Sequence, residues 1–168
     1  MGGGGGGGIP SDTLKKLEEK AKEKLKEADN TCRHVFISFG HEDLTDVNLL
    51  RGQAKNEKSA LEFDDHSVHE PFDSKNAEYI KQKIREKINR ASVTLVYLTK
   101  NSAQSKWVNW EIEESIKQGK GVIGVYKGDS PPTQLPKAFS DNKCKAVKWV
   151  QKDITDAIEQ ACVKRDKK

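Results

Sequence analysis

The sequence has few cysteines, no long apolar run and no arginine-rich segment, and each of these absences excludes a class of protein. Its three cysteines, Cys32, Cys144 and Cys162, have no metal-like spacing, so they predict reduced thiols and no zinc site. The sequence contains no stretch of about eighteen apolar residues and no charged region followed by an apolar one at its start. We therefore expect a soluble, cytoplasmic protein with no bound metal and no membrane partner.

The positive charge of the chain is weak evidence for a nucleic-acid partner. The net charge is +4 and arises largely from lysines near the two ends. Proteins that bind nucleic acids gather arginine and lysine on one face, often with aromatic residues between them, and this pattern is absent here. We therefore expect no nucleic-acid partner.

The length of 168 residues predicts one domain with tails. Residues 1–10 are a glycine run that predicts a disordered tail, and Gly6 stands where a myristoylation signal requires serine or threonine. Residues 11–30 begin with a Ser-Asp-Thr cap and repeat leucine and alanine at helical spacing, which predicts a charged amphipathic helix. This helix could form a short coiled coil, dock on a partner, lie against the domain or project from it. We assign the domain itself to residues 31–164.

Strands and helices alternate along this domain. Four segments are rich in β-branched and apolar residues, as in buried parallel strands: 34–39, 60–65, 92–99 and 121–126. Residues 145–150 are a candidate fifth strand. Four amphipathic helical stripes lie between or after them and begin at Leu44, Ile80, Val108 and Ile154. Alternation of this kind predicts a flavodoxin-like, doubly wound α/β fold, with about five parallel strands in the order 2-1-3-4-5 and helices on both faces.

Ligands of doubly wound sheets bind beyond the carboxyl ends of the strands. The segments that follow the strands are therefore the candidate functional loops: 40–43, 65–74, 100–105 and 127–132. They lack the Ser/Thr-rich phosphate loop of flavodoxins and the Gly-x-Gly-x-x-Gly turn of dinucleotide-binding domains. The third strand ends in Thr99 and Lys100, where a phosphorylatable receiver domain needs an aspartate.

Glu111 is the carboxylate most favourably placed for chemistry. On a helix with 100° per residue, it falls about 40° from Trp107, at the edge of the buried stripe that begins at Val108. It also lies in the first turns after a strand's carboxyl end, and therefore borders the predicted crevice. The alternative is a helix-flank carboxylate paired with a lysine. Glu113 and Glu114 lie farther from the buried stripe, and we interpret them as solvated charges.

Several motifs together resemble the TIR superfamily, and most closely the TIR-like family that includes the TIR subunit of the Thoeris anti-phage defence system. The motifs span residues 33–126 in order: FISF with a following ED, EFDDHS, SVTLVYLT, SKWVNWEI and KGVIGVY. The sharpest element is Trp107-Val108-x-x-Glu111-Ile112, because NAD-consuming TIR domains carry their catalytic glutamate four residues after a tryptophan on this helix. The segments Asn48 to Arg51 and Phe63 to Ser67 are also similar to that family.

This resemblance implies an NAD glycohydrolase or ADP-ribosyl cyclase with Glu111 as its catalytic residue. The bond between nicotinamide and ribose breaks through a transition state with oxocarbenium character, which a nearby carboxylate stabilises. Nicotinamide leaves as a neutral ring, so no strong general acid is needed. NAD is then a substrate, and no cofactor is implied.

Further residues are candidates for binding the substrate. Phe39, Gly40 and His41 follow the first strand and could line a nucleotide pocket, Gly40 by close approach of its backbone. Trp107 could pack on nicotinamide or ribose, or belong to the core. Arg51 could hold a phosphate or form an internal ion pair. Two positions open the loop that corresponds to the mobile loop of TIR domains: Asp65 and Ser67.

Three functional hypotheses therefore stand at this stage. The first is a signalling NADase of anti-phage defence, whose product is ADP-ribose or a cyclic isomer, with possible self-association and a downstream effector that reads a cyclic nucleotide. The second is a non-catalytic TIR-type interaction module, which needs no carboxylate at Glu111. The third is an enzyme similar to nucleoside deoxyribosyltransferases, another doubly wound domain with a catalytic glutamate.

Overall fold

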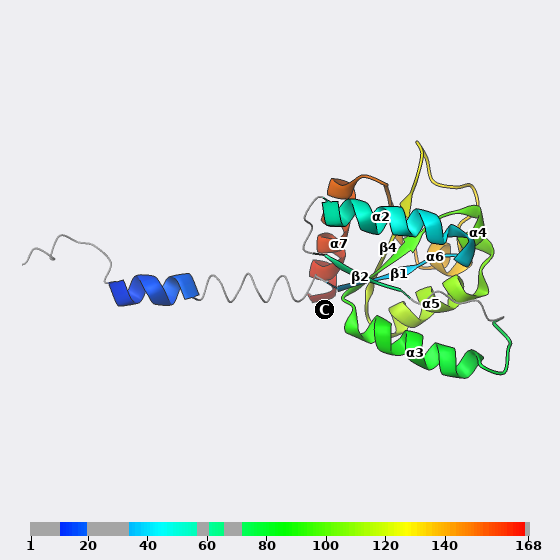
Figure 1. Cartoon of the computed structure of the whole chain (residues 1–168), viewed down its shortest axis with the longest axis horizontal. Helices are drawn as coiled ribbons and strands as arrows, with labels where there is room; N and C mark the ends of the chain where they lie inside the picture. The colour runs from blue at the N-terminus through cyan, green and yellow to red at the C-terminus, as the bar shows by residue number, and fades with distance from the viewer. Residues whose placement is uncertain (1–10, 20–33, 57–60, 66–71, 167–168) are drawn as a thin grey trace, which may run out of the picture.

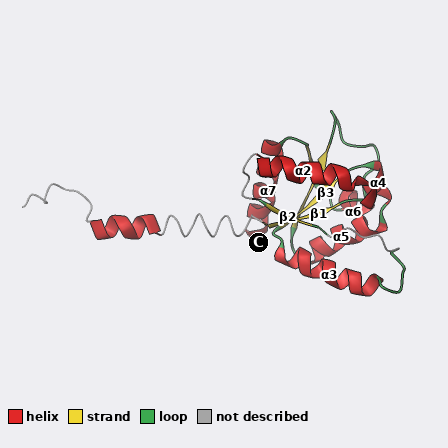
Figure 2. Cartoon of the chain, viewed as in Figure 1, coloured by secondary structure: helices red, strands yellow, loops and turns green. Residues whose placement is uncertain are grey.

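A computed structural model describes residues 11–19, 34–56, 61–65 and 72–166, with side chains up to residue 162. Its sheet has five strands, all parallel, in the order β2-β1-β3-β4-β5. The strands are β1 (His34–Ser38), β2 (Glu62–Asp64), β3 (Val93–Tyr97), β4 (Gly121–Tyr126) and β5 (Lys145–Lys148). Figures 1 and 2 show helices on both sides of this sheet. The predicted fold class and strand order are therefore confirmed.

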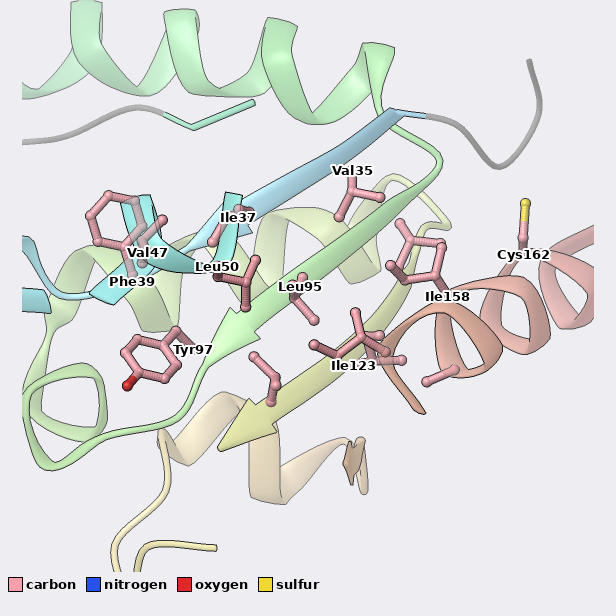
Figure 3. Packing of buried hydrophobic residues seen from close by; sticks show 14 residues of the cluster. Val35, Ile37, Phe39, Val47, Leu50, Leu95, Tyr97, Ile123, Ile158 and Cys162 are labelled. Atoms are coloured by element: carbon pink, nitrogen blue, oxygen red, sulfur yellow. The ribbon is translucent and has the colours of Figure 1, made fainter. Parts of the chain in front are cut away.

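The helices cover the two faces of the sheet in pairs. On one face lie α2 (Leu44–Asn56) and α7 (Gln151–Asp166), whose buried side chains share a core cluster with Val35 and Ile37 of β1. On the other lie α3 (Ala77–Arg90) and α5 (Lys106–Lys117), which pack near Phe36 and Val96. Figure 3 shows the first cluster, in which alternate residues of β1 and β3 point to the same side. This alternation leaves Ser38 on the α5 side with Phe36.

Three short helices follow strands or loops and were not predicted. They are η2 (His41–Asp43), α4 (Lys100–Gln104) and α6 (Lys137–Asp141). Each has five residues or fewer, too few to show an apolar periodicity in the sequence. The first two occupy the predicted functional loops 40–43 and 100–105, so these loops form short helices at the carboxyl ends of β1 and β3.

The interpretation of residues 60–65 as a buried strand is wrong. Within the described residues 61–65, the strand comprises Glu62–Asp64, and both of its end residues are exposed. Among the described strands, β2 is an edge strand that pairs with β1 alone. Its apolar neighbours Leu61 and Phe63 are half-buried against the first core cluster, and this contact explains the apolar signal in the sequence.

Gly124 of β4 is a position where the core leaves no room for a side chain. A Cβ atom there would lie 2.6 Å from both Leu98 Cδ1 and Phe139 Cζ, and both of these side chains are almost fully buried. We expect Gly124→Ala to lower the free energy of unfolding by about 1–3 kcal/mol, the usual cost of overpacking.

Denaturant unfolding measures this effect, with Gly52→Ala as the matched control. Gly52 lies within α2, and a Cβ atom there would meet nothing within 4 Å. That exchange should raise stability by about 0.5–1 kcal/mol, because alanine is the better helix former. Equal stability of Gly124→Ala and the parent protein would contradict the packing described here.

Residues 11–19 of the predicted N-terminal helix are helical, and every one of them is exposed, including Leu14 and Leu17. The remainder of that helix and the predicted glycine tail, residues 1–10 and 20–30, lie outside the described residues. No helix within the described ranges is long and apolar enough to cross a membrane.

The prediction of reduced thiols is wrong for Cys162. Cys162 is disulfide-bonded and fully buried, whereas Cys144 is a free, half-buried thiol. Burial raises the pKa of the Cys144 thiol to about 11, so it is protonated at neutral pH. Cysteine chemistry therefore gives no support to the predicted cytoplasmic location.

Candidate functional site

Glu111 lies in the first half of α5, which begins where Ser105 caps it. The Ser105 side chain accepts a hydrogen bond from the Val108 backbone N–H at 3.2 Å, and α5 then buries Val108 and Ile112 against the sheet. Glu111 is only 3% exposed. Its carboxyl group is therefore buried at the sheet, and the alternative of a helix-flank carboxylate paired with a lysine is wrong.

The partner of Glu111 is Ser38, the last residue of β1. The Ser38 hydroxyl donates a hydrogen bond to Glu111 Oε1 at 2.7 Å, and both side chains are buried. Burial raises the pKa of Glu111 to about 8, with a smaller contribution from the charge of Asp65, while the Ser38 hydrogen bond lowers it. Burial thus favours the protonated form of this carboxyl group at neutral pH.

A pocket of about 260 Å³ opens in front of this carboxyl group at the carboxyl ends of the strands. It is lined by Phe39, His41, Glu42, Asn101, Gln104, Ser105, Trp107 and Glu111. Glu111 and Trp107 thus open into one cleft with Phe39 and His41 of the loop after β1. The described lining residues include no lysine or arginine, so the pocket favours a cationic or neutral ligand.

The aromatic wall of the pocket also belongs to the core. Trp107 is 9% exposed and packs in the cluster that contains Phe36 and Ile84. The rings of Phe72 and Trp110 meet it edge to face, at 5.0 and 6.1 Å between centroids. Trp107 is therefore a core residue that also forms part of the pocket wall, and its packing on nicotinamide or ribose stays a prediction.

Asp43 joins two of the loops that line the pocket. Its carboxylate accepts hydrogen bonds from Thr99 Oγ1 at 2.5 Å and from Asn101 Nδ2 at 3.0 Å, and only 8% of the residue is exposed. Thr99 also caps α4 through the Ser102 backbone N–H. These hydrogen bonds connect η2 to α4, and both elements contribute residues to the pocket lining.

Of the other predicted binding residues, Gly40, Arg51 and Asp65 are absent from the described lining of this pocket. A Cβ atom on Gly40 would lie 3.0 Å from Glu42 Oε2 and 3.2 Å from Asn101 Cβ, so its close approach is to protein atoms. Arg51 forms an ion pair with Asp65, which is one of the two alternatives for this residue. Ser67 lies outside the described residues.

The interpretation of Glu114 as a solvated charge is wrong. It is 8% exposed, accepts a hydrogen bond from Gln118 Nε2 at 3.2 Å and lies 3.6 Å from Arg85 Nε. The helical angle alone missed this burial because α3 packs beside α5 and covers that flank. Glu113 is exposed, as predicted.

Sequence reasoning missed five residues that bear on the site, of two kinds. Four line the pocket from the predicted loops without having been singled out: Glu42, Asn101, Gln104 and Ser105. The fifth is Ser38, and its signal was a lone hydroxyl at the end of a strand that is otherwise apolar after His34.

The family model described as "Thoeris protein ThsB, TIR-like domain" matches residues 36–131. The chain belongs to this family. The matched range contains every described residue that lines the pocket. The TIR-like domain assigned from the sequence motifs is therefore confirmed.

Similar proteins share this domain at modest identity. "Putative cyclic ADP-D-ribose synthase ThsB1" of Bacillus cereus (strain MSX-D12) is 32% identical over 99 residues, which are 56% of this chain and 52% of that protein. "Putative cyclic ADP-D-ribose synthase TIR2" of Cytobacillus dafuensis is 25% identical over 142 residues, 83% of this chain and 36% of that protein. The chain thus spans about half or less of these relatives' lengths. The TIR domains of the activated Roq1 resistosome superpose with a TM-score of 0.44 and 20% identity, over 80% of this chain and 84% of that one.

Proposed function

We propose that this TIR-like domain is an NADase that cleaves the bond between nicotinamide and ribose, with Glu111 as its catalytic residue. The observation that carries the proposal is the buried carboxyl group of Glu111 at the end of a pocket whose described lining is aromatic, polar and acidic. The names of the two bacterial relatives support the same chemistry. NAD is the substrate, and the proposal needs no cofactor.

The pocket suits the cationic half of NAD. The nicotinamide ring of NAD carries a positive charge, and its flat face can pack on Phe39 or Trp107. A cation beside Glu111 lowers the pKa of that carboxyl group, since it favours the charged form. Binding of NAD is therefore coupled to release of the proton that Glu111 holds in the free protein.

The ionised carboxylate then assists the bond cleavage. As the bond between the ring nitrogen and the ribose carbon breaks, its electron pair neutralises the ring, and positive charge develops on the ribose. A carboxylate within the buried site stabilises that charge without reorganising solvent. Attack by water gives ADP-ribose, and attack by a second atom of the same molecule gives a cyclic isomer.

A non-catalytic interaction module is the less favourable alternative. Burying a carboxyl group that carries a strongly raised pKa costs stability, and an interaction module gains nothing from it. The wider role that we propose is signalling in anti-phage defence, within the cytoplasm, with self-association and a downstream effector that reads a cyclic product.

The test is to incubate the purified protein with NAD over a range of protein concentrations and to resolve the products by chromatography. We expect release of nicotinamide with an equal amount of ADP-ribose or a cyclic isomer, and a higher specific rate at high protein concentration if self-association completes the active form. NAD that stays intact at every concentration would contradict the proposed activity.

A further inference from the structure

Ser38 is a buried hydroxyl group in a strand that otherwise supplies the core. Val35, Phe36 and Ile37 are all at most 2% exposed, and Ser38 is fully buried after them. β1 pairs with β2 as far as Phe36 and with β3 as far as Ser38, whose partner is Val96, so Ser38 stands within the sheet. A buried hydroxyl in such surroundings destabilises the fold unless it finds a partner.

That partner is the side chain of Glu111, 73 residues away. A serine hydroxyl has one hydrogen to donate, and Ser38 donates it to Glu111 Oε1 at 2.7 Å. Among the described residues, Ser38 is the only group that hydrogen-bonds the carboxyl group of Glu111. The Ser115 hydroxyl, by contrast, donates to the Glu111 backbone carbonyl at 2.7 Å and so anchors the helix rather than the carboxyl group.

We propose that Ser38 is a positioning residue for Glu111, whose hydroxyl fixes the carboxyl group at the pocket wall and stabilises its ionised form. This role rests on the proposed NADase function for its effect on turnover. The effect on the ionisation of Glu111 does not depend on that function. It stands on the geometry of a single donor that meets a single buried carboxyl oxygen. A hydrogen bond to a charged oxygen is about twice as strong as one to a neutral oxygen, so the contact favours the carboxylate over the acid.

A charged group near the site also affects the pKa of Glu111, since Asp65 acts against the Ser38 hydrogen bond. Within the described ranges, the charged and titratable groups near the site are the ion pair of Arg51 with Asp65, the η2 residues His41, Glu42 and Asp43, and the ion pair of Arg85 with Glu114. Asp65 raises the pKa of Glu111, as burial does, whereas the Ser38 hydrogen bond lowers it. Removing the hydroxyl should therefore leave the carboxyl group protonated to a higher pH.

Ser38→Ala tests the proposal directly, without NAD. The side-chain carboxyl carbon of Glu111 is followed by NMR in protein labelled with ¹³C-glutamate, and Glu111→Gln identifies its signal by loss. We expect the titration midpoint of Glu111 to rise by about one to two pH units in Ser38→Ala, the scale of one hydrogen bond to a charged group. An unchanged midpoint in folded Ser38→Ala would overturn the proposal.

Thr94→Val is the matched control. Thr94 of β3 is also fully buried, and its hydroxyl lies 2.7 Å from the Ser115 hydroxyl rather than near the Glu111 carboxyl group. The exchange removes a buried hydroxyl from the neighbouring strand at nearly constant volume. It should alter stability and leave the Glu111 midpoint where it is. An equal shift in both variants would show that loss of any buried hydroxyl disturbs the site, and would overturn a specific role for Ser38.

Turnover provides the second measurement. If the ionised carboxylate performs the cleavage, kcat/KM of Ser38→Ala at neutral pH should fall about tenfold for each pH unit by which the titration midpoint of Glu111 rises. The value of kcat/KM should recover as the pH is raised. A merely structural defect would lower the rate equally at every pH. If the parent protein proves inactive on NAD, the proposed function fails while the titration still decides the role of Ser38, so the two failures are distinguishable.

Discussion

Glu111→Gln is expected to lower the turnover of NAD by about two orders of magnitude or more while NAD still binds, the scale of one lost electrostatic stabiliser. Glutamine keeps the shape of the side chain and can still accept the Ser38 hydrogen bond, but it carries no charge to stabilise the ribose. The measurement is the initial rate of nicotinamide release, with NAD affinity determined separately by calorimetry.

Glu113→Gln is the control for this experiment. Glu113 lies two residues away on α5 and is exposed, so its exchange removes one helix charge without touching the pocket. Glu114 is unsuitable because it is buried and lies 3.6 Å from Arg85 Nε. Retention of the parent's rate by Glu111→Gln would show that Glu111 is a buried structural carboxyl group and that the proposed chemistry lies elsewhere.

The same exchange should stabilise the fold, and the gain should grow with pH. The pKa of Glu111 rises from 4.5, the value expected of an unfolded chain, to about 8 in the folded protein. Between these values the folded state holds a proton that the unfolded state has released, so its stability falls as the pH rises. At pH 7 the loss is about 3 kcal/mol, since each pH unit above 4.5 contributes about 1.4 kcal/mol.

Glutamine carries no titrating proton and escapes this loss. Urea unfolding of the parent and of Glu111→Gln at several pH values should show similar stabilities near pH 4.5, a widening gap up to about pH 8 and a constant gap above it. Glu113→Gln should show no gap of this form. A gap that stays flat across the range would mean that Glu111 titrates near its ordinary pKa and that burial does not hold its proton.

The two outcomes for Glu111 have one physical origin. A carboxyl group buried beside a hydroxyl and aromatic rings is poorly solvated, which raises the free energy of its charged form in the resting protein. The same poor solvation strengthens its interaction with positive charge that develops on a bound substrate. If Glu111 performs the proposed cleavage, activity and stability oppose each other at this position, as they do at many active sites.

The alternation of apolar strands with amphipathic helices was enough to predict the fold, because a parallel sheet must bury both faces under helices. The strand order, the loops that carry the pocket and the place of Glu111 on α5 all agree with that pattern. The exposure of the edge strand β2 was not predictable in this way. β2 shows an apolar segment in the sequence but is an edge strand among the described strands, since its place in the sheet depends on a crossover and not on its own residues.

The sequence alone determined the family, through motifs read in order, and the carboxylate most favourably placed for chemistry, through its angle to Trp107. Only the tertiary structure decided the surroundings of that carboxylate. Ser38 and Glu111 stand 73 residues apart and meet because β1 is central in the sheet and α5 crosses its face. The burial of Glu114 depends in the same way on α3. Helical periodicity reports the direction of a side chain from its own axis, whereas partners and burial depend on elements that distant segments supply.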